Sequence, residues 1–115
     1  MYEYLPKTIK GEYSVGTAYA LISGLPIVFS KSGTYRVSAY HSYSHAIPQG
    51  LIISRSDSDY TASLNILAKA ETTSDVAVLS ASTTIQTTAG TAYYIWAKAK
   101  TANTNQMGVT IEYLG

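Results

Sequence analysis

Residues 82–114 read STTIQTTAGTAYYIWAKAKTANTNQMGVTIEYL, in which β-branched and aromatic residues recur at every second position between short polar turns. A period of two predicts strands, because successive side chains of a strand point to opposite faces of a sheet. Residues 33–40, GTYRVSAY, repeat the pattern. We therefore predict an all-β chain folded as an antiparallel β-sandwich of about eight strands.

The rest of the chain supplies the other strands. Short apolar or alternating runs predict strands within residues 17–22, 26–29, 51–55 and 76–80, with a loop at residues 45–50. Residues 60–70 fit both helical and strand spacing, and their Ser and Thr content favours an irregular strand. The alternation predicts a core that contains Val28, Tyr35, Val37, Ile53, Val78, Ile85, Ile95, Val109 and Ile111.

Length and composition limit the classes of function. A chain of 115 residues is one domain, and we predict a single sandwich over residues 1–115 in which residues 1–16 form an extended N-terminal arm. Only 13% of the residues are charged and the net charge is +1, which argues against a nucleic-acid partner. There is no cysteine, and we find neither a secretory leader nor an apolar run long enough for membrane insertion. We therefore expect cytosolic synthesis.

One motif resembles a known superfamily. Phe29, Gly33 and Tyr35 form an F-x-x-x-G-x-Y pattern, and a Ser- and Thr-rich hairpin leads through Gly90 into an aromatic strand and a closing strand. This order, over residues 25–115, is similar to the tumour-necrosis-factor and C1q-like jelly rolls. It differs from them in the residue after Gly90, which is Thr91 rather than Asp. The resemblance implies a jelly roll.

Small cysteine-free, hydroxyl-rich domains of this shape are also similar to the C-terminal knobs of bacteriophage tail fibres, needles and head fibres. That resemblance implies a homotrimer in the virion, synthesised in the host cytoplasm, that attaches to a host surface glycan or protein. The alternative location is extracellular, as part of a larger secreted protein.

Aromatic residues give the strongest candidate site. Tyr94 and Trp96 fall on the strand face opposite Tyr93 and Ile95, and Tyr40 falls opposite Val37 and Ala39 on its own strand. If the smaller residues fill the core, Tyr40, Tyr94 and Trp96 are exposed and form a subunit interface or a ligand surface. If the faces are reversed, Trp96 is instead a core residue.

Other residues with functional chemistry form weaker patterns. His41 is expected to be partly buried beside Tyr35 and Val37, and His45 to be an exposed loop residue. Asp57 and Asp59 have the D-x-D spacing of a calcium loop but lack its remaining ligands, and an Asx turn explains them equally well. A ligand loop of His45, Asp57 and Asp59 is the lower-ranked alternative to the aromatic site.

These observations favour a non-enzymatic protein with no catalytic residue, metal or cofactor. The leading hypothesis is a trimeric phage or phage-like structural domain that binds a receptor. The alternative is a monomeric carbohydrate-binding module that stacks a sugar on Trp96 and tyrosines, with calcium at Asp57 and Asp59 as an option. A small enzyme ranks third, because no nucleophile motif accompanies the two histidines.

Overall fold

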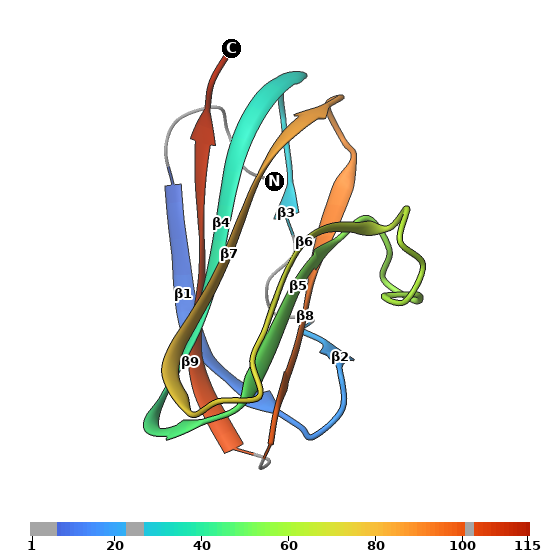
Figure 1. The fold of residues 1–115 in the computed structure, drawn as a ribbon. Helices are drawn as coiled ribbons and strands as arrows, with labels where there is room; N and C mark the ends of the chain where they lie inside the picture. The colour runs from blue at the N-terminus through green and yellow to red at the C-terminus, as the bar shows by residue number, and fades with distance from the viewer. Residues whose placement is uncertain (1–6, 23–26, 101–102) are drawn as a thin grey trace.

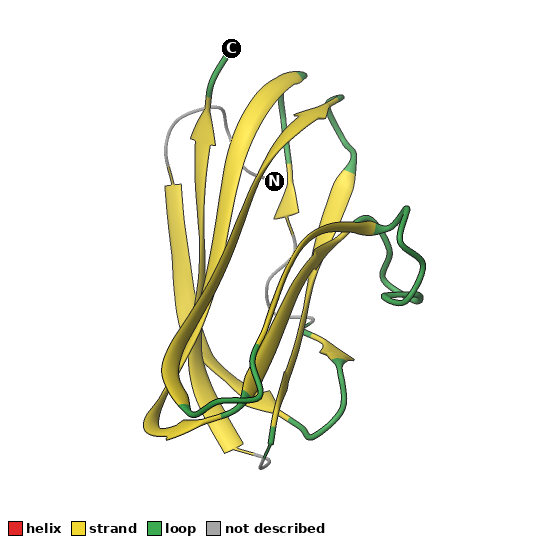
Figure 2. Ribbon diagram, viewed as in Figure 1, coloured by secondary structure: helices red, strands yellow, loops and turns green. Residues whose placement is uncertain are grey.

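The chain folds into two facing β-sheets (Figures 1 and 2). The structure is a computed structural model that describes residues 7–22, 27–100 and 103–115, with the side chains of residues 13–22, 27–43, 47–100 and 106–115. These residues form nine strands and contain no helix. Accordingly, no helix in the described part of the chain is long and apolar enough to cross a membrane. The predicted all-β class is confirmed.

The strands divide between two antiparallel sheets. They are β1 (Lys7–Val15), β2 (Ala20–Leu21), β3 (Ile27–Val28), β4 (Gly33–Ile47), β5 (Gln49–Ser54), β6 (Ile66–Glu71), β7 (Val76–Thr87), β8 (Ala92–Ala99) and β9 (Asn103–Tyr113). The first sheet has the order β1-β9-β4-β7, and the second has the order β2-β8-β5-β6 with β3 also paired to β8. With β3 set aside, the chain distributes eight strands over the two sheets in the interleaved order of a jelly roll.

The core lies between the sheets and matches most of the predicted list. Seven of the nine predicted residues are buried: Tyr35, Val37, Ile53, Ile85, Ile95, Val109 and Ile111. Two were placed wrongly, since Val28 is only half-buried and Val78 is 60% exposed. Val78 has the opposite parity to Ile85 on β7, so the two side chains point to opposite faces, and Leu79 packs against the core instead.

The Phe29-to-Tyr35 motif shapes one end of the core. The Phe29 and Tyr35 rings stack with centroids 4.1 Å apart, and the Tyr35 hydroxyl donates to the Lys31 carbonyl at 2.7 Å. Gly33 has a φ of +156°, and a Cβ built there would lie 2.6 Å from Cε1 of Tyr113. The glycine is therefore needed for the Tyr113 ring to lie against the β4 backbone.

Three predicted boundaries change. The predicted loop at residues 45–50 was wrong, because β4 continues to Ile47 and β5 begins at Gln49, with Pro48 alone between the two strands. A proline cannot donate to a strand ladder, so it ends the pairing without needing a long loop. Within residues 60–70 only Ile66 onward is strand. Of the predicted N-terminal arm, Lys7–Val15 form β1 and pair with β9, and residues 1–6 lie outside the described residues.

Candidate functional site

The second sheet buries side chains on its outer face as well as its inner face. Trp96 pairs across strands with Ile52 on β5 and Leu21 on β2, so these three residues share the face that points away from the core. Ile52 is 1% exposed and Trp96 is 7% exposed. An outer face that is this well covered needs a cover from elsewhere in the chain.

The cover comes from the loop between β5 and β6, which projects from the sandwich (Figure 1). The Tyr60 ring packs against the Trp96 ring with centroids 5.0 Å apart, and Nε1–H of Trp96 donates to the Ser56 carbonyl at 2.9 Å. Asp59 holds the loop in shape, because its Oδ1 accepts hydrogen bonds from the amide and hydroxyl of Thr61 at 2.9 and 2.6 Å. The predicted Asx turn is therefore present.

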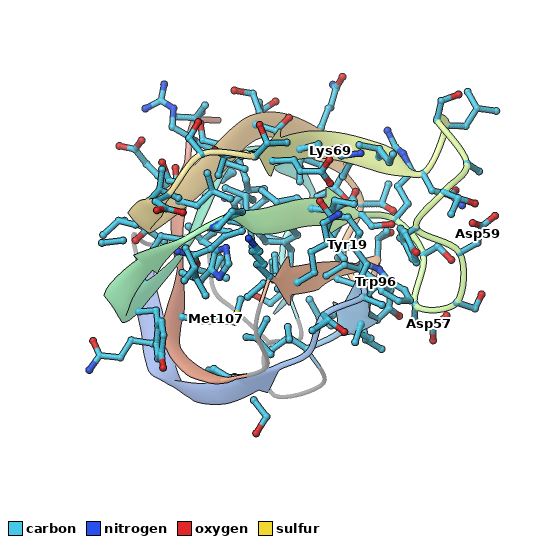
Figure 3. The ribbon with its side chains drawn as sticks, turned by 60° about the horizontal axis from the view of Figure 1, so that its bottom comes forward. Tyr19, Asp57, Asp59, Lys69, Trp96 and Met107 are labelled. Carbon is cyan, nitrogen blue, oxygen red and sulfur yellow. The ribbon has the colours of Figure 1, made fainter. Side chains whose placement is uncertain are left out.

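Tyr19 extends this aromatic cluster across the sheet. Its ring centroid lies 5.1 Å from that of Tyr60, and Figure 3 shows Tyr19 between Lys69 and Trp96. A Cβ built at Gly50 would lie 2.8 Å from Cζ of Tyr19. Tyr19 thus lies directly on the β5 backbone, at a position that only glycine leaves open. We call Tyr19, Tyr60 and Trp96 the outer aromatic cluster.

Charged side chains surround the Tyr19 end of the cluster. The Tyr19 hydroxyl donates to Oε1 of Glu71 at 2.7 Å, and the same oxygen lies 3.2 Å from Nζ of Lys98 and 3.9 Å from Nζ of Lys69. The two ammonium groups also lie 4.8 Å (Lys98) and 5.8 Å (Lys69) from the Tyr19 ring centroid.

This network shifts the pKa of both acids. The hydrogen bonds from Tyr19 and Lys98 lower the pKa of Glu71, whereas burial and the neighbouring Glu71 carboxylate raise the pKa of Tyr19. Near neutral pH the pair therefore consists of an anionic Glu71 and a neutral, hydrogen-bond-donating Tyr19.

A hollow of about 320 Å³ opens beside this network, at the end of the second sheet. It is lined by Thr17, Pro48, Gln49, Glu71, Thr72, Thr73, Lys98, Ala99 and Lys100. The lining combines hydroxyls, ammoniums and a carboxylate, so it offers both donors and acceptors. A second, more open hollow lies near Arg55, Gln86 and Tyr93. The outer aromatic cluster lines neither hollow, but its Tyr19 bonds to Glu71 in the lining of the first.

The structure places the predicted aromatic residues on two different faces. Tyr94 and Trp96 do lie on the outer face of the second sheet, so the predicted orientation of β8 is confirmed. The expected exposure of Trp96 was wrong, because residues 55–65 cover it within the same chain. Tyr94 is half-buried. Tyr40 is also half-buried, but it pairs with Ser80 and Gly108 on the outer face of the first sheet, away from the other two.

The predicted histidines and aspartates do not form one site. His41 lies on the inner face of β4 beside Tyr35 and Val37, as expected, but it is fully buried where partial burial was predicted. Burial lowers its pKa from 6.5 to about 4. His45 was expected in a loop, yet its backbone belongs to β4, and its side chain is outside the described part. Asp57 and Asp59 lie on the projecting loop (Figure 3). Among the described residues no three His, Cys, Asp or Glu side chains gather as a metal site.

Comparison with known proteins supports the fold. No protein-family model matches the chain, and no curated protein matches it. Among solved structures, it is similar to one described as showing that "Bacillus endospore appendages form a novel family of disulfide-linked pili", with 14% identity, a TM-score of 0.58, and coverage of 95% of this chain and 86% of the other. It also matches a carbohydrate-binding module from Cellvibrio mixtus lichenase 5A in complex with cellotriose, at 11% identity and a TM-score of 0.46, covering 92% and 88%.

The first likeness supports a class of fold, a β-sandwich, and no more. The first is too distant in sequence to carry a function, and the TM-score of the second is too low to carry an argument. The disulfide links named for the pili cannot form between copies of these 115 residues, which contain no cysteine.

Three residues of this site were not predicted from the sequence. Tyr19, Gly50 and Glu71 come from separate segments that only strand pairing brings together. Gly50 carried the one available signal, since a glycine inside an apolar strand often marks the close approach of another group.

Proposed function

We propose that this chain is a non-enzymatic binding module that holds a glycan in the hollow beside Tyr19. The observation that carries the proposal is the Tyr19–Glu71–Lys98 network, which fixes donors and acceptors at the edge of a preformed hollow. Binding sites typically combine such a concave space with a few polar groups in fixed positions. A sugar presents hydroxyls that both donate and accept, which matches the mixed lining.

The size of the hollow fits a ligand of one or two sugar rings. Its volume of about 320 Å³ is at the lower end of the range for small-ligand sites. Thr17 and Thr73 supply hydroxyls around it, whereas the Thr72 hydroxyl donates to the Ser74 carbonyl at 3.1 Å and accepts from the Ser74 amide at 2.9 Å. The Thr72 backbone is fixed because its amide donates to the Gln49 carbonyl at 3.0 Å. Part of the site is therefore organised before a ligand arrives.

A glycan array with matched variants tests this proposal. We expect the wild type to bind a defined subset of glycans, and Glu71→Gln to lose most of that binding because the variant removes the carboxylate that orients Tyr19 and Lys98. Glu112→Gln is the control, since Glu112 forms a comparable ion pair with Arg36 at 2.8 Å on the first sheet. A wild type that binds no glycan, or equal losses in the two variants, would contradict the proposal.

We further propose the setting predicted from the sequence, a phage or phage-like virion protein of tumour-necrosis-factor or C1q-like kind that assembles as a homotrimer. The support is the interleaved jelly-roll order of the strands, together with a hydroxyl-rich outer face on the first sheet. Trp96 gives no support, because its own chain covers it. Tyr40 is the remaining aromatic candidate for a subunit contact.

Sedimentation tests the assembly independently of the ligand. A trimer at micromolar concentration that is weakened by Tyr40→Ser, and unchanged by Glu71→Gln, is the expected result. A monomeric wild type would contradict the trimer and leave the glycan site unaffected, since all its described residues come from one chain.

A further inference from the structure

The hollow carries more positive than negative charge. Of the lining residues that the structure describes, Lys98 and Lys100 are cationic and Glu71 is anionic. Lys69 adds a third ammonium beside Glu71. Asp75, in the loop after β6, is exposed and does not line the hollow.

The charges are not equally available to a ligand. Glu71 already accepts from Tyr19 and faces the ammoniums of Lys69 and Lys98, so its charge is compensated within the network. Lys100 differs from these residues. Among the described residues its side chain takes part in no ion pair, hydrogen bond or ring contact, while its amide donates to the Pro48 carbonyl at 2.9 Å and fixes the backbone. Lys100 thus adds an uncompensated ammonium at the rim.

From this arrangement we infer that the hollow selects an acidic saccharide, one that carries a carboxylate, with the ligand carboxylate beside Lys100 and Lys98 and the sugar hydroxyls toward Thr17 and Thr73. The inference rests on the proposed glycan-binding function and adds the chemical class of the glycan. A Lys ammonium attracts a carboxylate as a point charge and donates hydrogen bonds to it.

A saccharide suits the space better than a simple anion does. A single inorganic ion would leave most of a volume of about 320 Å³ empty, and it would not use the threonine hydroxyls that also line the hollow. The Tyr19 hydroxyl already donates to Glu71. It therefore orients the Glu71 carboxylate and does not bind the ligand itself.

The experiment uses the full chain and pairs of glycans that differ in charge alone. Free uronate oligomers are compared with the same oligomers after methyl esterification, sialyllactose with lactose, and inorganic sulfate serves as the simple anion. Affinity is measured by titration at low and at physiological ionic strength. We expect the acids to bind more tightly than their neutral partners, and added salt to reduce that preference, because the Debye length falls from about 30 Å at 0.01 M to about 8 Å at 0.15 M.

Two variants test whether Lys100 causes the preference for acidic glycans. Lys100→Met should lower the ratio of the affinity for each acid to that for its neutral partner by about two- to fivefold, the usual value of one exposed charge contact. Arg36→Met removes one positive charge from the opposite sheet and should change neither affinity. Because Lys100 is exposed and its side chain forms no ion pair, hydrogen bond or ring contact with the described residues, the variant should fold like the wild type.

Each outcome bears on one of the two proposals. Glycan binding without an acid preference, or with a preference that Lys100→Met does not reduce, overturns the inference and leaves the glycan site in place. Sulfate binding as tight as that of the acidic glycans overturns the inference in favour of a simple anion site. A wild type that binds no member of either pair contradicts the proposed function itself.

Discussion

The two sheets differ in how far their outer faces are buried. On the first sheet the outward residues Arg36, Tyr40, Val78 and Glu112 all stay at least partly exposed. On the second sheet Ile52 and Trp96 occupy the corresponding face and are almost fully buried. The difference is made by the loop of residues 55–65 and by Tyr19, which lie over the second sheet only.

This contrast separates two properties that strand alternation does not distinguish. The period of two decides which side of a sheet a residue faces. It does not decide whether that side is covered, because the cover is supplied by loops with no period of their own. An outward-facing aromatic residue is therefore a sign of an intermolecular interface only after the chain's own loops are accounted for.

Removing Trp96 should destabilise the fold far more than removing an aromatic residue from the outer face of the first sheet, and this is the largest effect that we expect. Trp96→Ala leaves a cavity under Tyr60 and removes the donor to Ser56, so we expect a loss of about 3–5 kcal/mol in the free energy of unfolding. Tyr40→Ala, on the uncovered first sheet, should cost about 1 kcal/mol or less. Urea unfolding measures both.

Fluorescence provides a second readout, because Trp96 is the only tryptophan. The native emission should be that of a buried indole and should shift to the red on unfolding. Equal destabilisation by the two variants, or the emission of a solvent-exposed indole in the native protein, would contradict the claim that the chain covers Trp96 on the outer face of the second sheet.

His41 is a titratable residue buried on the inner face of the first sheet, whereas the titratable residues Arg36 and Glu112 on its outer face are exposed to solvent. Because burial lowers its pKa from 6.5 to about 4, the unfolded chain binds a proton in this pH interval that the folded chain does not. Stability should therefore fall as the pH drops from about 6.5 to about 4, by at most about 3 kcal/mol at about 1.4 kcal/mol per pH unit.

Unfolding measured across this pH range checks the prediction, with His41→Leu as the comparison. The variant should lack most of the slope, since leucine does not titrate and suits the apolar site beside Met107 and Leu79. A folded-state NMR titration that places the His41 pKa near 6.5 would contradict the predicted slope.

The fold was largely predictable from the sequence. Residues 82–114 contain the alternation of β7, β8 and β9, and the burial of Tyr35, Val37 and Ile95 follows from the same period. Val78 was misplaced because a short apolar run gives no parity unless it is continued along the strand to Ile85. The strand order in each sheet was not predicted, since alternation alone does not choose partners and the resemblance implied only a jelly roll.

The candidate site was much less predictable. Trp96 stood out as a large residue facing away from the core, but its cover depends on Tyr60 and Ser56, which lie in a loop without hydrophobic periodicity. Tyr19 and Glu71 are 52 residues apart and meet only through the order β2-β8-β5-β6. Contacts of this kind depend on tertiary structure and leave no local pattern.

Gly50→Ala tests whether the Tyr19 ring lies against the β5 backbone on the outer face of the second sheet. The new methyl group would collide with the Tyr19 ring and force it away from β5, so we expect a loss of about 1–3 kcal/mol and weaker glycan binding. Gly16→Ala is the matched control, since a Cβ there has no heavy atom within 4 Å, and it should be neutral or slightly stabilising. Urea unfolding and glycan titration of the two variants separate the effects. Similar losses in both would exclude the close approach of Tyr19.

The smallest expected effect concerns the ion pairs of the two faces. The side chains of Glu71 and Glu112 are 37% and 46% exposed, so each carboxylate should contribute less than about 1 kcal/mol. Glu71→Gln should nevertheless cost more than Glu112→Gln, because Glu71 accepts from Tyr19 and faces two lysines, whereas Glu112 faces Arg36. Thermal unfolding at low and high salt measures the difference, which should shrink as salt screens the lysines. If Glu112→Gln costs as much as Glu71→Gln at low salt, the network around Tyr19 does not organise the outer face of the second sheet.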